Sequence, residues 1–79
     1  MALERSYTVV LLPEPEAGGF SVSVPSLPEI ATQGESEQEA LANAREAVSL
    51  VISDRAQRGG EIPPSDVEPP RFERVAVAV

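Results

Sequence analysis

The segment of residues 20–47 constrains the fold more than any other part of the chain, because strand, proline and helix signals follow one another there without a gap. Residues 20–24 alternate apolar and serine side chains, the period of two that predicts a strand with one buried face. Pro25 and Pro28 then interrupt the ladder, since proline has no N–H to donate. Residues 30–33 predict a short strand that pairs back on the first.

A long helix is predicted after this strand pair. Gly34 is expected to release the backbone into a turn by adopting a positive φ. Ser36 and Glu39 have the spacing of a capping box, in which the Ser36 hydroxyl accepts from the Glu39 N–H and the Glu39 carboxylate reaches back to the Ser36 N–H. The helix should span residues 37–58 and end at the glycine pair that follows, with one of the two in the left-handed region. Helical spacing predicts its buried face as Leu41, Ala44, Val48, Val51, Ile52 and Arg55.

The remaining segments predict two more strands. Residues 7–12 are apolar and β-branched, which is typical of a strand buried on most of both faces. Residues 13–19 contain two prolines and a Gly-Gly pair and predict a loop. Residues 61–71 contain two Pro-Pro pairs and predict an extended linker, and residues 72–79 predict the last strand. We expect one α+β domain over residues 1–79 with two layers, a four-stranded mixed sheet (β-β-β-α-β, order 3-2-1-4) and one helix on one of its faces.

The composition excludes several kinds of site. None of the 79 residues is cysteine or histidine, which excludes disulfides, thiolate chemistry and zinc centres built from these ligands. We therefore expect no metal and no cofactor. A chain this small without such staples commonly gains stability by oligomerisation.

The charge pattern indicates a protein partner more than a nucleic acid. The formal net charge is −7, and the six basic residues are arginines scattered along the chain, so we expect no direct nucleic-acid binding. An acidic surface more often serves solubility than function; the sharper interpretation is an acidic partner for a basic protein. No apolar run reaches the roughly 18 residues of a membrane span, and the N-terminus lacks a secretion signal. We expect a cytoplasmic protein without membrane attachment.

Several motifs in one order resemble the HicB-like antitoxin family. They are Gly19-Phe20, Val24-Pro25-Ser26-Leu27-Pro28, Thr32-Gln33-Gly34-Glu35-Ser36, the helical run from Glu39 to Ala47, and Ile62-Pro63-Pro64. The resemblance implies a fold likened to part of ribonuclease H. It also implies neutralisation of a HicA-type toxin, a small mRNA-cleaving protein. Where family members often carry Gly-Cys after the second proline, this chain has Glu29-Ile30, a change in a surface loop that bears on the partner contact.

The resemblance leaves alternatives to a stand-alone antitoxin. Many append a DNA-binding domain, which we do not expect after Val79, so autorepression is not expected either. A solitary oligomeric module with another protein partner stays an alternative to the antitoxin. A third alternative is a two-metal nuclease, which needs several converging carboxylates. The first two predicted strands contain no acid, and Glu46 and Glu73 are isolated in the predicted helix and last strand.

Structural explanations suffice for Ser36 and for the glycine pair, and two expectations stay open for Asn43. Ser36 has no histidine or lysine to activate it as a nucleophile, so capping accounts for it, and we expect no catalytic residue in the chain. The Gly-Gly pair at residues 18–19 lacks the following helix and lysine of a phosphate loop. Asn43 is expected either to bond to the loop backbone near residues 25–28 or to be plainly exposed.

The sequence therefore predicts a non-enzymatic antitoxin that covers a basic toxin and also associates with itself. The predicted partner-binding residues are Glu14, Glu16, Glu29 and Glu35. The predicted self-association residues are Val75, Val77 and Val79, in an edge strand that from Val75 onward lacks the lysine, proline or bulge that discourages pairing. The structural motif is carried by Gly19, Pro25, Pro28, Gly34, Ser36 and Glu39.

Overall fold

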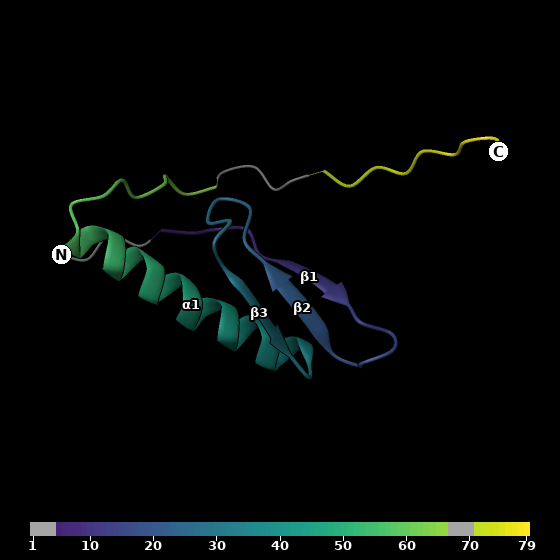
Figure 1. The fold of residues 1–79 in the computed structure, drawn as a ribbon, viewed down its shortest axis with the longest axis horizontal. Helices are drawn as coiled ribbons and strands as arrows, with labels where there is room; N and C mark the ends of the chain where they lie inside the picture. The colour runs from purple at the N-terminus through teal and green to yellow at the C-terminus, as the bar shows by residue number, and fades with distance from the viewer. Residues whose placement is uncertain (1–4, 67–70) are drawn as a thin grey trace.

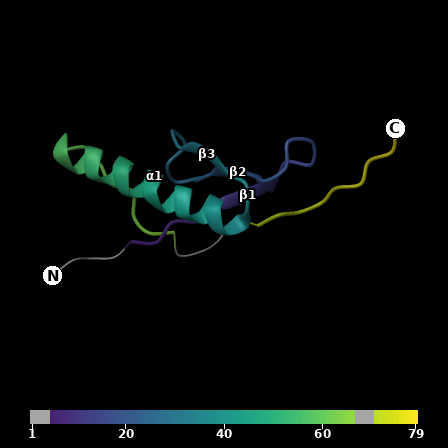
Figure 2. The same cartoon turned by 90° about the horizontal axis from the view of Figure 1, so that it is seen from below.

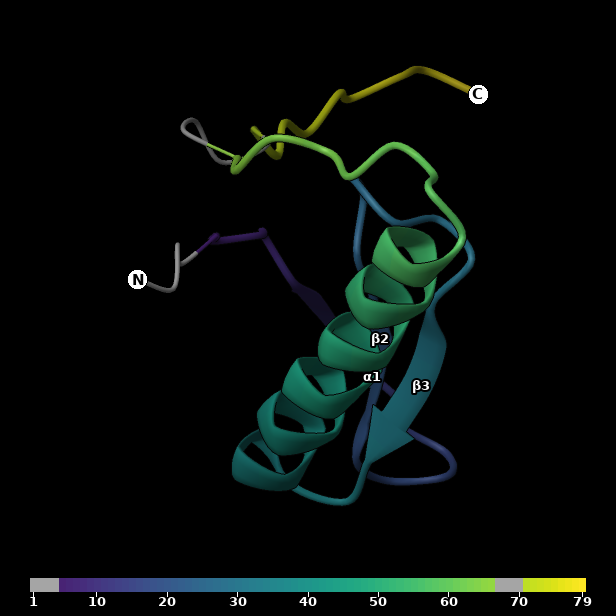
Figure 3. The ribbon, with the colours of Figure 1, turned by 90° about the vertical axis from the view of Figure 1, so that its left-hand side faces the viewer.

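The protein is an α+β domain with a three-stranded antiparallel sheet and one long helix. The computed structural model describes residues 5–66 and 71–79 (Figure 1). The strands β1 (Val10–Pro13), β2 (Phe20–Ser23) and β3 (Ala31–Gly34) lie in the order β1-β2-β3. The helix α1 (Glu37–Gln57) crosses one face of this sheet and packs mainly on β3 and β2 (Figure 3). The expected α+β class and single long helix are confirmed.

The strand register places the apolar residues on the face toward α1. Val22 lies opposite Leu11 on β1 and Thr32 on β3, and it is buried against the helix. Ser21 and Ser23 alternate with it and belong to the other face, which no helix or strand of the described residues covers. The period-two pattern of this strand is thus confirmed.

The first strand is shorter than predicted. It begins at Val10, and residues 7–9 are outside the sheet. The reason is that these residues bond to another segment: the Thr8 N–H donates to the Asp66 carboxylate, and the Ser6 carbonyl accepts from the Asp66 N–H. Backbone groups committed to Asp66 cannot take part in a ladder with β2.

The core consists of two clusters on either side of the middle of α1. One joins Val22 to Ala40 and Ala44, where small side chains let the helix lie close to the sheet. The other joins Val24, Leu27 and Ile30, which lie in and beside the proline-bounded crossing between β2 and β3. The crossing is therefore a core element as well as a connection, with Leu27 fully buried between the exposed Pro25 and Pro28.

The caps of α1 largely follow the expectation. The Ser36 hydroxyl accepts from the Glu39 N–H at 3.1 Å. The Glu39 carboxylate was predicted to accept from the Ser36 N–H, but it accepts from the Glu35 N–H at 3.4 Å. This second bond of the predicted capping box is therefore wrong by one residue. At the other end Gly59 has φ +70°, and the N–H of Gly60 donates to the Arg55 carbonyl at 2.8 Å, a Schellman-type ending.

The role predicted for Gly34 is wrong. The glycines with positive φ are Gly18, Gly19 and Gly59 among the described residues. Gly34 is needed for a different reason, because a Cβ there would lie 2.3 Å from the Ala40 nitrogen. The residue allows the start of α1 to pass directly over the end of β3.

The predicted fourth strand is not present. Residues 71–79 form no strand and are exposed, and they project away from the sheet (Figures 1 and 2). The radius of gyration is 15.0 Å, against about 12 Å for a compact chain of this length. A strand needs a hydrogen-bonding partner, and no described strand lies beside this segment. Part of the predicted linker, residues 67–70, lies outside the described residues.

The helix face differs from the prediction at one position. Ala40 and Ala44 are buried, and Val48, Val51 and Ile52 are partly buried against the second cluster. Leu41, predicted to be buried, is 45% exposed, because α1 packs mainly on β3 and β2 and Leu41 faces the side of β1. In the described part of the chain, no helix is long and apolar enough to cross a membrane.

Candidate protein-binding surfaces

Two of the predicted partner-binding acids lie together at one end of the sheet. Glu14 is held by the loop between β1 and β2: its N–H donates to the Gly19 carbonyl at 2.9 Å, and its carbonyl accepts from the Gly18 N–H at 2.7 Å. Glu35 lies in the turn between β3 and α1. Both connections are at the same end of the molecule (Figure 1), and a Cβ on Gly19 would lie 2.4 Å from the Gly34 carbonyl oxygen.

Between these two connections is a hollow of about 280 Å³, which we call the acidic hollow. It is lined by Glu14, Ala17, Gly18, Phe20, Gln33, Gly34, Glu35 and Glu39. The lining contains three carboxyl groups, one aromatic ring and no basic side chain. The arrangement is suited to the basic side chains of another protein. Glu39, which the sequence indicated only as a capping residue, is part of this surface.

The other two predicted acids are placed differently. Glu16 is exposed in the loop between β1 and β2 and does not line the hollow. Glu29 lies in the crossing between β2 and β3 and pairs with Arg55 near the end of α1, with 2.5 Å between their atoms. Its own backbone N–H, followed by the Arg55 guanidinium, lowers the pKa of the Glu29 carboxyl. An acid already paired within the chain is a poor candidate for a partner contact.

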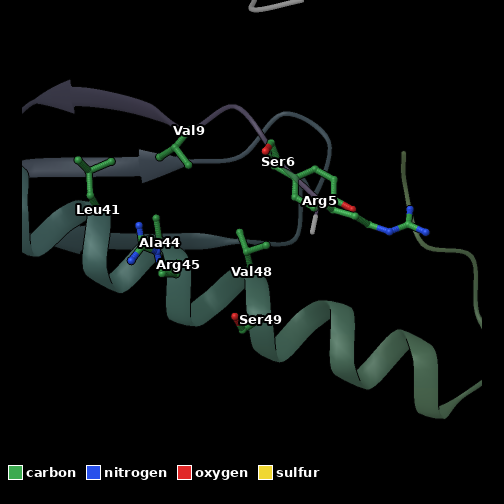
Figure 4. Close-up of a pocket in the computed structure, with 9 residues that line it drawn as sticks. Arg5, Ser6, Val9, Leu41, Ala44, Arg45, Val48 and Ser49 are labelled. Atoms are coloured by element: carbon green, nitrogen blue, oxygen red, sulfur yellow. The ribbon is translucent and has the colours of Figure 1, made fainter. Parts of the chain in front are cut away.

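A second concave surface, which the sequence did not indicate, lies between α1 and the chain that leads into β1 (Figure 4). It has a volume of about 390 Å³, and we call it the helix groove. It is lined by Arg5, Ser6, Tyr7, Val9, Leu41, Ala44, Arg45, Val48 and Ser49. Figure 4 shows Leu41 and Val48 rising from the helix toward the strands. The groove thus has a mixed lining, with apolar side chains from Val9, Leu41 and Val48 and with two arginines.

The wall of this groove is held by residues 61–66. Asp66 makes three bonds there: its N–H donates to the Ser6 carbonyl at 2.9 Å, and its carboxylate accepts from the Thr8 N–H at 2.7 Å and from the Ser26 hydroxyl. The Ser26 hydroxyl, followed by the Thr8 N–H, lowers the pKa of the Asp66 carboxyl. The Tyr7 hydroxyl donates to the Pro63 carbonyl at 2.6 Å. The linker is therefore anchored as far as Asp66.

Two further polar predictions can be compared with the structure. The Asn43 amide donates to the Gln33 carbonyl at 2.7 Å, so it ties α1 to β3, and neither expectation for Asn43 was right. Among the residues described, no group of three or more acids is arranged to hold a metal ion.

The predicted self-association residues are all on the projecting segment. Phe72, Val75 and Val77 are 76%, 82% and 74% exposed, and Val79 is also exposed. We call residues 71–79 the tail. It has four large apolar side chains in nine residues and makes no contact that buries them.

Comparison of the sequence with known proteins identifies a family. A model described as the HicB-like antitoxin of bacterial toxin–antitoxin systems matches residues 6–78. A UPF0150 protein of Thermoplasma acidophilum is 37% identical over 62 residues, which cover 78% of this chain and 88% of that protein. The family match therefore spans the sheet, the helix, the Pro-rich segment and most of the tail.

Proposed function

The chain belongs to the HicB-like antitoxin family of bacterial toxin–antitoxin systems, and on that premise we propose that it neutralises a small, basic, mRNA-cleaving toxin of the HicA type. The mechanism is occlusion: the antitoxin covers the basic surface with which the toxin holds RNA. The observation that carries this proposal is the acidic hollow, which Glu14, Glu35 and Glu39 line together with Phe20. Carboxylates around an aromatic ring match a basic surface with an apolar centre.

The overall charge supports the same partner. With a net charge of −7, the protein attracts a basic protein over a distance of several ångströms, and this raises the association rate more than the final affinity. Glu29 contributes less in this proposal, because Arg55 already neutralises it. Glu16, in the exposed loop between β1 and β2, contacts the toxin at the edge of the proposed interface.

The protein is proposed to act without enzymatic activity of its own. The isolated positions of Glu46 on α1 and Glu73 on the tail support this, since a two-metal nuclease needs converging carboxylates. Purified protein incubated with RNA and Mg²⁺ or Mn²⁺ should give no turnover. Turnover that disappears in Glu46→Gln or Glu73→Gln would contradict the proposal.

Self-association is the second part of the proposal, and it is favoured by the exposed apolar tail. It also applies to the alternative of a solitary module whose protein partner is not a toxin. We also propose that residues 72–79 form the fourth strand, which would complete the likeness to part of ribonuclease H. These residues have the alternating pattern of a strand. Pairing with a second chain would give them the hydrogen-bonding partner that a strand needs.

Co-expression tests the antitoxin role. A HicA-type toxin from the same genome should arrest growth, and the wild-type chain should restore it. Glu14→Arg combined with Glu35→Arg should abolish the rescue. Glu46→Arg combined with Glu61→Arg makes the same charge change at exposed positions outside the hollow and should rescue normally. Continued arrest in the presence of soluble wild-type protein, or equal rescue by both variants, would refute the role of the acidic hollow.

A further inference from the structure

We propose that the tail of one chain forms the missing sheet strand of a second copy, adding to the free edge of β1 with its valines in the helix groove. This inference rests on the proposed self-association and specifies the receiving site. It does not depend on the toxin. The exchange is reciprocal, so that two tails fill two grooves in a closed two-fold dimer.

The tail has the properties of a strand without a sheet. Its side chains alternate, with Glu73, Val75, Val77 and Val79 on one side and Phe72, Arg74, Ala76 and Ala78 on the other. The large apolar members are exposed, and the segment extends away from the body (Figure 2). A contiguous row of exposed apolar side chains is typical of a surface that binds a partner.

The receiving edge is β1. It bonds to β2 on one side, and within the described chain no strand lies on the other side. Its outer backbone groups are therefore open to a further strand. The helix groove is next to this edge, because Val9 directly precedes β1 and lines the groove together with Leu41 and Val48.

The side chains of the tail fit this position on both faces. With its odd-numbered residues toward α1, the valines meet the apolar part of the groove lining. The Glu73 carboxylate comes to a groove that also contains Arg5 and Arg45. The even-numbered residues then continue the open face of the sheet. There the small Ala76 and Ala78 would lie beside Leu12, which is 54% exposed.

The anchor at Asp66 explains why the strand comes from a second copy. Asp66 is bonded to Ser6 and Thr8, so its position along the sheet is fixed just before β1. If the chain after Asp66 ran parallel to its own β1, residue beside residue, Phe72 would come level with Pro13, where β1 ends. Val79, seven residues further on, would then lie about 23 Å past the end of the sheet at the usual rise of a strand. In that register the valines would lie beyond the sheet of their own chain, which favours a second copy as their partner.

The chain contains no cysteine, so engineered cysteines report the contact cleanly. Two single-cysteine chains of different length are refolded together and oxidised, one with Leu41→Cys and the other with Val75→Cys, Val77→Cys or Val79→Cys in turn. A disulfide needs Cα atoms closer than about 7 Å, and we expect at least one of the three tail positions to give a crosslinked dimer of mixed length. Ala76→Cys and Ala78→Cys, on the opposite side of the tail, are the matched controls and should not crosslink.

Light scattering after size exclusion separates the possible failures. Wild-type protein at tens of micromolar should have twice the mass of the chain, and Val77→Lys should shift it toward the monomer. A wild-type monomer would overturn both self-association and the exchange. A dimer in which no odd-numbered tail cysteine reaches Leu41→Cys, or in which the even-numbered controls crosslink equally, would overturn the exchange alone. A third chain carries both Leu41→Cys and Val77→Cys. A disulfide that forms only within this chain would show that the tail folds onto its own groove, which also overturns the exchange. Loss of toxin rescue has no bearing on these readouts.

Discussion

The substitution Gly34→Ala probes the closest approach between the sheet and the helix. An added Cβ would lie 2.3 Å from the Ala40 nitrogen and 2.6 Å from the Ala40 Cα, whereas ordinary contact starts at 3.4 Å. Both atoms belong to the backbone of α1 and cannot rotate away as the end of a side chain can. The helix must therefore move off β3 by about 1 Å, the difference between 2.3 and 3.4 Å.

The cost of this movement follows from what the helix covers at that point. Ala40 and Ala44 pack on Val22 in one of the two core clusters. Overpacking a core position costs about 1–3 kcal/mol, and a contact with rigid backbone belongs at the upper end. A loss of about 3 kcal/mol is a large part of the roughly 4–12 kcal/mol expected for a domain of this length. It corresponds to a fall in Tm of about 12–24 °C.

Urea and thermal unfolding followed by circular dichroism measure this loss. Gly60→Ala is the matched control, because a Cβ there meets nothing closer than 3.4 Å, and its stability should stay within about 1 kcal/mol of wild type. Adding Ala40→Gly to Gly34→Ala should not restore stability, since glycine keeps the nitrogen and Cα that cause the clash. A midpoint for Gly34→Ala equal to that of wild type, or rescue by Ala40→Gly, would refute the reasoning.

Two further predictions concern the helix cap and the anchor of the linker. Ser36→Ala should lower the free energy of unfolding by about 1 kcal/mol, because the Glu39 N–H loses its acceptor. Ser53→Ala is the control, since Ser53 is exposed on the same helix. Equal urea midpoints for the two variants would contradict the capping role of Ser36. The Asp66 carboxyl has a folded-state pKa below its ordinary value of 3.8, so the unfolded chain binds the proton more readily. The stabilisation is present above that value and is lost as the pH falls through the lower folded-state pKa. Asp66→Asn should therefore flatten the free energy of unfolding against pH from about pH 5 downward, and parallel profiles for the two proteins would contradict it.

Local signals were enough to predict the regular elements. Serines alternating with apolar residues identified β2, and Ser36 and the glycines after Arg58 identified the ends of α1. These signals depend on residues close in sequence, so no knowledge of the fold was required. The same holds for the motif that indicated the family, whose match over residues 6–78 confirms the resemblance.

Positions that depend on distant partners were not predictable in this way. Asp66 acts on Ser6, Thr8 and Ser26, which are 40 to 60 residues earlier in the chain, and nothing in its local sequence indicates them. Gly34 shows a related difficulty: glycine serves either a positive φ or a close approach of backbones, and the residue type is the same in both cases. The tail was predicted as a strand from its pattern, but the pattern does not say which chain supplies the partner.

The acidic hollow combines features that the sequence indicates locally with features that depend on distant partners. Glu14 and Glu35 were predicted as partner-binding acids, and the structure places both in the lining of one hollow at one end of the sheet. Glu29 was predicted with them, yet Arg55 near the C-terminal end of α1 pairs with it. Charge can be read from the sequence, whereas the pairing of charges depends on which elements meet.

The helix groove itself follows from the small residues that bring α1 close to β3. Gly34 and Ala40 allow the N-terminal part of the helix to pass directly over β3, and α1 packs more on β3 than on β2. A helix drawn toward one edge of a sheet leaves the other edge less covered, and here that edge is β1. Leu41 and Val9 are consequently left lining an open groove in place of a closed core. A bulkier residue at Gly34 would push α1 off β3 and so move Leu41 relative to Val9. A changed groove, and a weaker dimer if the tail binds there, should therefore accompany the loss of stability.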